Sequence, residues 1–333
     1  MDVFYERDAD LELIRGRRVA LVGYGSQGRT HALNLRDSGV ADIRVALKPD
    51  SATVGKARAD GFEVVATAEA AGWAEVLVMA APDEVQPDLY AAEIGPRLAP
   101  GATLLFIHGL AVNFGLIRLA AGLDVVLCCP KGAGPGIRSV YERGGGVFGL
   151  VAVHQDATGR ARDTVLSYAA ALGCGRAGIL VTSFRDECEC DLLGEQAVLC
   201  GGVPELIRAA WETLVEAGYP PEVAYFECLH ETKLVTDLIY AHGIAGMYAR
   251  VSNTAEYGAY LTGPRVVGPE SRRALSEALG AVQDGSFVAR LMQDHRAGQP
   301  ELKALRAEAA GRPIEAAGAR LRALAASPEV FRS

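Results

Sequence analysis

The sequence predicts an α/β fold, with an N-terminal doubly wound parallel sheet of the Rossmann-like type and a C-terminal all-helical domain. Three observations predict it. Short apolar runs alternate with helical segments through the first half of the chain. One of these runs leads directly into a glycine-rich turn that opens a helix. After about Thr182 the strand patterns disappear and long helical patterns take over. Strand and helix in alternation are typical of a doubly wound sheet.

The strands are predicted from runs of apolar residues, because strands covered on both faces by helices are apolar throughout. These runs are Arg17–Val22, Ile43–Leu47, Val76–Ala80, Leu104–Ile107 and Val125–Cys129, with Val147–Val153 and Gly178–Val181 as further candidates. Helices are predicted over Leu192–Ala217 and Pro221–Tyr240, and in the segments from Ser271 onward. We therefore expect domains at residues 1–181 and 182–327, and a tail at 328–333.

Length and composition are those of a globular protein with two domains. The chain has 333 residues, 50% of them hydrophobic and 22% charged, which is enough for two cores. With 33 Lys+Arg against 41 Asp+Glu, the net charge of -8 argues against a general nucleic-acid surface. No apolar run reaches the roughly 18 residues of a membrane span, and the start of the chain lacks a signal-peptide core. We expect a cytoplasmic protein.

The cysteines do not indicate a disulfide framework. There are seven, an odd number, and none forms a C-x-x-C pair, which also opposes a zinc site. Cys128 and Cys129 end an apolar run, and we interpret them as small buried hydrophobic residues.

The glycine-rich turn follows the first predicted strand. It reads Gly23-Tyr24-Gly25-Ser26-Gln27-Gly28 and matches the G-x-G-x-x-G fingerprint of dinucleotide binding. Gly23 permits the tight turn, Gly25 lets the backbone approach a pyrophosphate, and Gly28 lets helix and strand pack closely. The free N–H groups at the helix start would then bind the phosphates. The alternative is a glycine-rich turn with no ligand.

The loop after the second predicted strand bears on the choice of dinucleotide. Lys48, Ser51 and Thr53 could surround a ribose 2′-phosphate, which favours NADPH. Asp50 lies in the same loop and would repel that phosphate, or bind a free 2′-hydroxyl if it points inward. We predict NADPH, with NADH as the alternative.

Four carboxylates indicate a second site. Asp191 and Glu195 are four residues apart, and Glu227 and Glu231 repeat this spacing. On a helix, residues four apart lie on one face, so two such pairs can converge on one or two hard cations such as Mg²⁺. For an arbitrary pair a solvated helix face is the commoner case. Here apolar residues crowd around both pairs, so we expect buried acids that need a partner, and a metal is the simplest one.

Two further residues lie where predicted strands end. His108 follows one apolar strand and Lys131 follows another. In an open α/β sheet, residues at the carboxyl ends of strands face the ligand crevice. Both are candidates for substrate positioning or proton transfer.

These motifs together resemble class I ketol-acid reductoisomerases (acetohydroxyacid isomeroreductases), from about Tyr5 to past Arg265. The matching stretches are Val22-Gly-Tyr-Gly-Ser-Gln-Gly28, Pro82-Asp-Glu, Asp191-Leu-Leu-Gly-Glu-Gln-Ala-Val-Leu-Cys-Gly-Gly202, Ala224-Tyr-Phe-Glu-Cys-Leu-His-Glu231 and Ser252-Asn-Thr-Ala-Glu-Tyr-Gly258. The resemblance implies a two-step reaction at two Mg²⁺ ions, a step of branched-chain amino-acid (valine and isoleucine) biosynthesis. A 2-aceto-2-hydroxy acid such as 2-acetolactate undergoes alkyl migration, and NADPH then reduces the product to a 2,3-dihydroxy acid.

The resemblance also implies roles for individual residues. Asp191 would bridge the metals and Glu195 would bind one of them, while Glu227 and Glu231 would reach in from the partner subunit. Ser252 would contact the substrate carboxylate. The remaining matches are catalytic His108, Lys131 and Glu187, and cofactor-binding Asp83, Gln86 and Gly134. A knotted helical domain and a homodimer, or a higher assembly of dimers with shared active sites, are implied as well.

Two loops depart from the family pattern. After His108-Gly109 the family usually reads Phe-Asn-Ile-His-Tyr, but this chain has Leu110-Ala-Val-Asn-Phe114; after Lys131-Gly132 it has Ala133-Gly134-Pro135 instead of Pro-Gly-His. A specialised paralogue acting on a related ketol acid is therefore one alternative. A catalytically degenerate NADPH-binding paralogue is a second, and a metal-free β-hydroxyacid dehydrogenase is a third.

Overall fold

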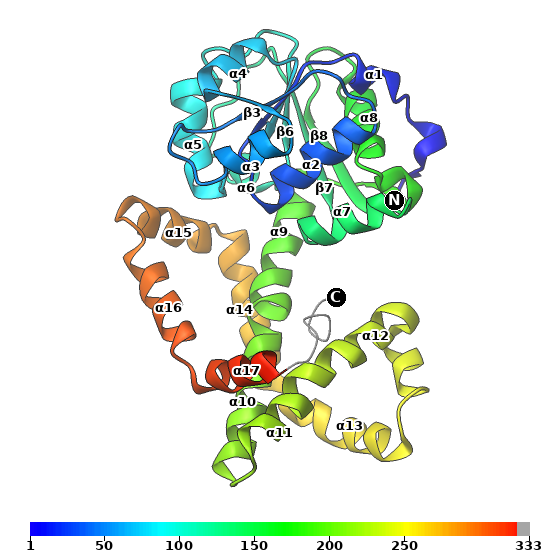
Figure 1. Ribbon diagram of the computed structural model, residues 1–333, viewed down its shortest axis with the longest axis vertical. Helices are drawn as coiled ribbons and strands as arrows, with labels where there is room; N and C mark the ends of the chain where they lie inside the picture. Colours follow the sequence, from blue (N-terminus) through cyan, green and yellow to red (C-terminus); the bar gives the residue numbers. More distant parts are fainter. Residues whose placement is uncertain (325–333) are drawn as a thin grey trace. The chain divides into compact units, whose positions relative to one another are not determined.

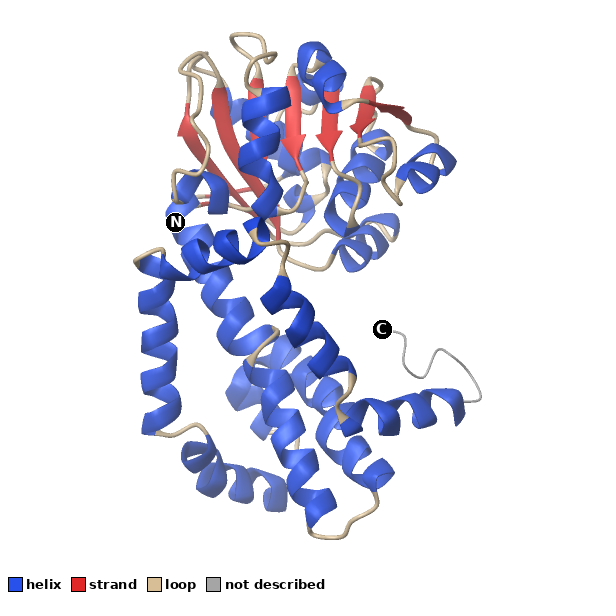
Figure 2. Ribbon diagram, turned by 90° about the vertical axis from the view of Figure 1, so that its left-hand side faces the viewer, coloured by secondary structure: helices blue, strands red, loops and turns tan. Residues whose placement is uncertain are grey.

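The computed structural model describes residues 1–324, so the tail predicted at 328–333 lies outside the described residues. The chain divides into two compact units, Met1–Cys190 and Asp191–Ser333 (Figure 1). The division falls inside helix α9 (Phe184–Gly194), shortly after the boundary predicted at 181/182. All described strands belong to the first unit, and the described part of the second unit is helical (Figure 2). The predicted fold class is confirmed.

The first unit is built on one nine-stranded sheet in the order β1-β9-β8-β7-β6-β5-β2-β3-β4. Its strands are β1 (Val3–Phe4), β2 (Val19–Val22), β3 (Ile43–Ala46), β4 (Glu63–Val65), β5 (Val76–Met79), β6 (Thr103–Phe106), β7 (Asp124–Pro130), β8 (Gly149–Gln155) and β9 (Ile179–Val181). The pairs from β4 to β7 are parallel, whereas β7 pairs with β8, and β9 with β1, in the antiparallel sense. The direction of strand order reverses at β2, between β3 and β5.

Helices cover both faces of this sheet, because successive strand residues point to opposite sides. Val19 and Leu21 of β2 pack into one core, and Ala20 and Val22 pack into the other. The helices of this unit are α1 (Glu12–Arg15), α2 (Ser26–Asp37), α3 (Val54–Ala59), α4 (Thr67–Trp73), α5 (Gln86–Leu89), α6 (Leu110–Asn113), α7 (Gly134–Glu142), α8 (Ala161–Ala171) and the start of α9. With both faces buried, the strands carry the continuous apolar pattern that predicted them.

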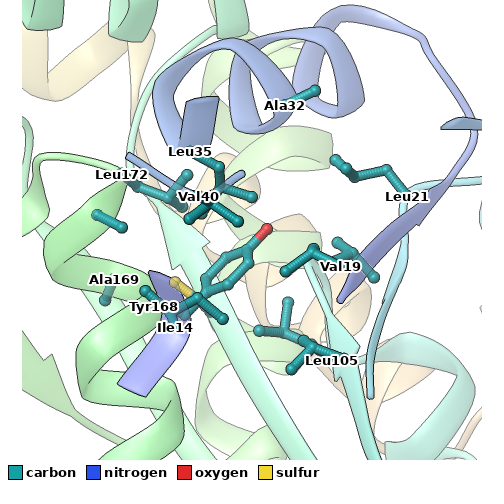
Figure 3. Packing of buried hydrophobic residues seen from close by; sticks show 14 of the residues in the cluster. Ile14, Val19, Leu21, Ala32, Leu35, Val40, Leu105, Tyr168, Ala169 and Leu172 are labelled. Carbon is teal, nitrogen blue, oxygen red and sulfur yellow. The ribbon is translucent and has the colours of Figure 1, made fainter. Parts of the chain in front are cut away.

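A polar pair is buried in the first of these cores. Tyr168 of α8 lies among apolar side chains that include Leu35 and Leu172 (Figure 3). Its hydroxyl lies 2.8 Å from Nδ1 of His31 in α2, and both residues are fully buried. Burial lowers the pKa of His31 from 6.5 to about 3, so the ring is neutral near neutral pH. This neutral pair fixes α2, the helix that opens at the glycine-rich turn, against α8.

The His31 pKa predicts an acid-dependent loss of stability. Between pH 6.5 and about 3 the unfolded chain binds a proton at His31 that the folded chain does not, so the unfolding free energy falls as the pH falls. The expected slope is at most about 1.4 kcal/mol per pH unit, with no contribution above the unfolded pKa. Urea unfolding at about pH 7 and about pH 5 should show a drop of roughly 2 kcal/mol that His31→Gln abolishes.

The control for this measurement is the exposed histidine of the second unit. His242→Gln changes a side chain in contact with solvent, and it should leave the wild-type slope in place. An unchanged slope in His31→Gln would show that other groups cause the acid sensitivity.

The second unit packs a small core of its own. Its large members include Trp211 of α10 (Gly202–Glu216), Tyr225 of α11 (Pro221–Tyr225) and Leu321 of α17 (Pro313–Leu324). The other helices are α12 (Glu231–Tyr248), α13 (Asn253–Val266), α14 (Pro269–Gln283), α15 (Ser286–Arg296) and α16 (Pro300–Ala310). Helix α12 is kinked at Gly243, whose φ is 73°. Among the described residues, no helix is both long enough and apolar enough to cross a membrane.

Two π-helical turns interrupt the helices predicted in this unit. The segment η5 (Glu195–Leu199) follows α9, and η6 (Phe226–His230) precedes α12. Behind η5, a Cβ atom on Gly201 would lie 1.8 Å from the carbonyl oxygen of Gln196, and one on Gly202 would lie 2.2 Å from that of Ala197. The wide turn therefore depends on two glycines. Such turns are rare in proteins overall, and many of those known lie at functional sites.

Candidate active site

The glycine-rich turn lies at the carboxyl end of β2, where the strand order reverses. Gly23 has a φ of 105°, and a Cβ atom there would lie 2.6 Å from the Ala80 carbonyl oxygen. A Cβ atom on Gly28 would lie 2.4 Å from the carbonyl oxygen of Gly23. A Cβ atom on Gly25, by contrast, meets nothing within 4 Å, and no side chain caps the start of α2. The open backbone and free N–H groups fit a dinucleotide pyrophosphate.

A cavity of about 460 Å³ opens beside this turn. Of the predicted cofactor residues, Tyr24, Gly25, Ser26 and Thr53 line it, but Lys48 and Ser51 do not. The other lining residues, which sequence reasoning missed, are Arg29, Thr30, Lys56, Pro135, Arg138, Ser139 and Glu142. Three of these carry positive charge, and they come from three different helices.

Asp60 organises one wall of the cavity. Its carboxylate accepts hydrogen bonds from Arg29 at 2.7 and 3.0 Å and from the Tyr24 hydroxyl at 2.9 Å. Hydrogen bonding from Arg29 lowers the pKa of Asp60 to about 2, against the opposing effect of burial. Burial, with the help of Asp60, raises the pKa of Tyr24. Tyr24 and Arg29 are thus held in place as a neutral phenol and a paired guanidinium.

The start of α7 packs directly on the start of α2. A Cβ atom on Gly134 would lie 2.3 Å from the Ser26 carbonyl oxygen, so only glycine fits there. Thr30 donates a hydrogen bond to the Gly134 carbonyl oxygen at 2.8 Å, and Gln27 donates one to that of Gly132 at 2.9 Å. The predicted residues Gln27 and Gly134 therefore join the loop after Lys131 to the glycine-rich turn.

Asp83 and Gln86 follow β5, the neighbour of β2. The Gln86 amide is buried and donates to the Ala81 carbonyl oxygen at 2.9 Å and to Asp83 Oδ1 at 3.0 Å. These bonds fix the segment next to Ala80, against which Gly23 packs. The cofactor contacts of Asp83 and Gln86 stay predictions.

A buried carboxylate joins the ends of β6 and β7. Glu187 of α9 has a fully buried side chain, and Lys131 Nζ donates to its Oε1 at 3.0 Å. His108 Nδ1 lies 3.2 Å from its Oε2, and the Gly109 N–H donates to the same oxygen at 3.1 Å. A Cβ atom on Gly109 would lie 2.7 Å from the Phe184 carbonyl oxygen, so this glycine permits the close approach of α9. The three predicted catalytic residues therefore form one cluster.

The cluster carries two cations on one anion. Burial opposes ionisation of Glu187, but hydrogen bonding and charge attraction from His108, and then from Lys131, lower its pKa to about 2. Burial likewise opposes protonation of His108, but hydrogen bonds to Cys188 and Glu187 and the charge of Glu187 raise its pKa to about 11. The Lys131 side chain is 35% exposed. The arrangement can hold an anionic substrate and deliver a proton.

Of the four carboxylates predicted to bind metal, only Asp191 lies close to other possible ligands in the described chain. Helix α9 continues without a break one turn past Glu187 to Asp191, and ligand atoms of His108, Glu187 and Asp191 all lie within 4.8 Å of one another. In the described part of this single chain, no such group of three includes Glu195, Glu227 or Glu231. These three glutamates are exposed, on or beside η5 and η6. The expectation that they are buried within the chain was wrong.

Ser252 is the N-cap of α13. Its hydroxyl accepts a hydrogen bond from the Ala255 N–H at 3.2 Å, and the residue is exposed. N-capping is a sufficient structural role for a serine at this position. The substrate contact implied for Ser252 stays a prediction.

Both parts of the chain match domains of one known protein family. Residues 13–178 match the family description "Acetohydroxy acid isomeroreductase, NADPH-binding domain", and residues 184–327 match "Ketol-acid reductoisomerase, C-terminal domain". A solved NADH-preferring ketol-acid reductoisomerase from an uncultured archean is 41% identical, with a TM-score of 0.95 over 98% of this chain and 100% of that one.

More distant structures share the fold alone. A semialdehyde dehydrogenase NAD-binding protein from Cupriavidus necator is 20% identical, with a TM-score of 0.58 over 80% of this chain and 99% of that one. A pyrroline-5-carboxylate reductase from Coxiella burnetii is 15% identical, with a TM-score of 0.53 over 80% and 98%.

Proposed function

The chain belongs to the ketol-acid reductoisomerase family, and we propose that it converts a 2-aceto-2-hydroxy acid into a 2,3-dihydroxy acid by alkyl migration and reduction. We take 2-acetolactate or a close relative as the substrate, and branched-chain amino-acid biosynthesis as the pathway. The observation that carries this proposal is the cluster that Lys131 and His108 form around the buried Glu187 carboxylate at the strand ends. It lies on the sheet that also presents the dinucleotide turn.

The proposal requires Mg²⁺ and a nicotinamide dinucleotide, and the residues fit both groups. Asp191 and Glu195 offer the carboxylate oxygens that Mg²⁺ prefers, and the first turn of α2 offers free N–H groups to a pyrophosphate. When bound, the metal supplies Lewis-acid polarisation of the substrate oxygens and the dinucleotide supplies the hydride. Glu227 and Glu231 complete the metal ligands from a second copy of the chain in this proposal.

The protein's own residues hold the substrate and move protons. Glu187 raises the pKa of His108 and fixes Lys131 Nζ and His108 Nδ1 at the end of the sheet. These donors attract an anionic substrate and stabilise the oxyanion that must form before the alkyl group migrates. After reduction, a proton from Lys131 Nζ, whose side chain is 35% exposed, neutralises the new alkoxide.

For the dinucleotide, we favour NADPH over NADH. The cavity beside the turn is lined by the cations Arg29, Lys56 and Arg138, which suits an additional phosphate. Asp50 is exposed in the loop before α3 and favours NADH only if it turns toward the ribose. The similar archaeal protein is described as NADH-preferring, so the two values of kcat/KM have to be compared directly.

A homodimer is part of the proposal, because the second unit leaves large apolar side chains uncovered. Tyr240 is 93% exposed, Tyr257 69%, Leu199 65% and Ile244 64%. An apolar cavity of about 830 Å³ lies between η5 and α10 on one side and α13 and α14 on the other. Exposed apolar surface on this scale is typical of a protein–protein interface. A second copy would cover it and bring Glu227 and Glu231 to the opposite Asp191 and Glu195.

One of the two altered loops is largely buried and therefore offers few side chains to a substrate. Leu110, Ala111 and Val112 of α6 are buried, and only Asn113 and Phe114 are partly exposed. Ala133 and Pro135, in the other altered loop, are exposed. A specialised paralogue acting on a related ketol acid would differ from its relatives mainly through these four residues.

The test is the rate of cofactor oxidation by the purified protein with 2-acetolactate and Mg²⁺. The assay is run with NADPH and with NADH, and is repeated with a panel of related ketol acids. Turnover should require Mg²⁺ and stop in EDTA. Turnover that persists in EDTA would support a metal-free dehydrogenase instead. Tight NADPH binding without turnover of any ketol acid would support a catalytically degenerate paralogue.

A further inference from the structure

The π-helical turn η6, which carries Glu227, rests on the core of the second unit. Its Cys228 and Leu229 pack against the buried side chains that α10, α11 and α17 bring together (Figure 1). Glu227, within the turn, and Glu231, directly after it, are exposed instead. The position of these two carboxylates therefore depends on how the core holds the turn beneath them.

Tyr225 is the residue through which α17 reaches the turn. It is buried, it ends α11, and it is the N-cap residue of η6. Arg322 of α17 donates a hydrogen bond to the Tyr225 hydroxyl at 3.2 Å. At the start of α11, Glu222 accepts a hydrogen bond from Arg320 of α17 at 2.8 Å. The two helices are thus joined at both ends of α11.

Gly318 of α17 lies against the ring of Tyr225. A Cβ atom on Gly318 would lie 2.8 Å from both Cε2 and the hydroxyl oxygen of Tyr225, and the same distance from Nη1 of Arg322. The Arg322 side chain is long enough to move aside, but the tyrosine ring is rigid and packed in the core. A side chain at position 318 would therefore displace the ring, and with it the start of η6.

We propose that α17 is the positioning element of the metal site, and that Gly318 and Arg322 fix Tyr225 so that Glu227 and Glu231 reach a cation in the correct place. The inference rests on the proposed function, in which these two glutamates complete the Mg²⁺ ligands of a second copy. None of the three positioning residues touches the metal. They act on its ligands as residues behind a metal site do, by orienting them.

The experiment is titration of the full chain with Mn²⁺, a paramagnetic probe for the Mg²⁺ site, with free Mn²⁺ measured by electron paramagnetic resonance. Gly318→Ala should raise the Kd for Mn²⁺ by about tenfold to a hundredfold, the usual effect of changing a residue that orients a metal ligand. In turnover, the Mg²⁺ concentration that gives half the maximal rate should rise by a similar factor. Tyr225→Phe added to Gly318→Ala should restore part of the affinity, because it removes one of the two ring atoms that clash.

A second variant tests the same contact without adding an atom to the core. Arg322→Gln removes the bond to the Tyr225 hydroxyl and should raise the Kd for Mn²⁺ by about threefold to tenfold, as expected for one hydrogen bond. Arg322→Lys keeps the charge and a donor and should recover part of this loss. Wild-type Mn²⁺ affinity in both Gly318→Ala and Arg322→Gln would overturn the inference.

Two controls separate positioning from general stability. A Cβ atom on Gly280 of α14 meets nothing within 4 Å, so Gly280→Ala should keep the wild-type Kd for Mn²⁺. Val282 is fully buried in α14, outside the core that holds η6. Val282→Ala should lower the thermal unfolding midpoint but leave the Kd unchanged. An equal loss of affinity in Val282→Ala and Gly318→Ala would contradict a positioning role.

The wild-type titration distinguishes this inference from the proposed function. Absence of Mn²⁺ binding by the wild-type protein would overturn both the proposed metal site and the role of α17. Tight Mn²⁺ binding that none of the α17 variants changes would overturn the role of α17 alone.

Discussion

Replacing Glu187 by glutamine is expected to lower kcat by about 10²–10⁴-fold, the range typical of a lost proton-transfer group. The amide is nearly the same size, but it removes the negative charge that pairs with Lys131 and raises the pKa of His108. Both donors then lose the partner that fixes their position, and the pKa of His108 should fall from its raised value. The measurement is kcat with saturating substrate, Mg²⁺ and cofactor.

The control for this variant lies one residue earlier in the same helix. Asp186 is exposed, so Asp186→Asn should keep wild-type kcat. Thermal unfolding of both variants separates a catalytic loss from a folding defect. A Glu187→Gln protein with normal kcat would remove this carboxylate from the mechanism.

The second large effect concerns the proposed sharing of the metal site between two subunits. Asp191→Asn and Glu227→Gln should each lower activity by at least about 10³-fold, because each removes a ligand of a cation that stabilises charge in the transition state. Co-expression of the two variants should restore about one quarter of wild-type activity. Half of the randomly mixed dimers are hybrids, and each hybrid has one intact site of its two.

A matched mixture provides the control. Asp191 and Glu195 lie on the same chain and would serve the same site, so a hybrid of Asp191→Asn and Glu195→Gln has no intact site. That mixture should stay inactive. Equal recovery in both mixtures, or none in the first despite hybrid formation, would contradict a site completed by the partner subunit.

The sequence predicted the fold class because its evidence is local. Apolar runs buried on both faces and a glycine turn between strand and helix are visible within a few residues. The strand β1 was missed because it has only two residues, and β4 because its three residues begin with Glu63 and form no apolar run. The π-helical turn η5 was missed too, since its signal is a pair of glycines at 201 and 202 that also fits an ordinary helix end. The knot and the dimer stay predictions.

The candidate site was predictable where a motif marks it and not where distant residues meet. Asp60 binds Arg29 from 31 positions away, and Glu187 binds Gly109 from 78 away. No spacing rule connects such positions.

The wrong prediction that Glu195, Glu227 and Glu231 are buried has a different cause. Apolar neighbours such as Val198 and Leu199 suggested burial within the chain, but they are 49% and 65% exposed, which agrees with a surface covered only in an assembly.

Helix α9 carries Glu187 and Asp191 on successive turns, which fixes their backbones about 6 Å apart along the axis. In the proposed enzyme, a cation bound at Asp191 would therefore act on the Lys131–Glu187–His108 cluster through one continuous helix. Thermodynamic linkage makes this influence mutual: whichever protonation state tightens ion binding is itself favoured by the ion to the same extent. If the proposed metal site is correct, metal binding and protonation of His108 form a single coupled equilibrium.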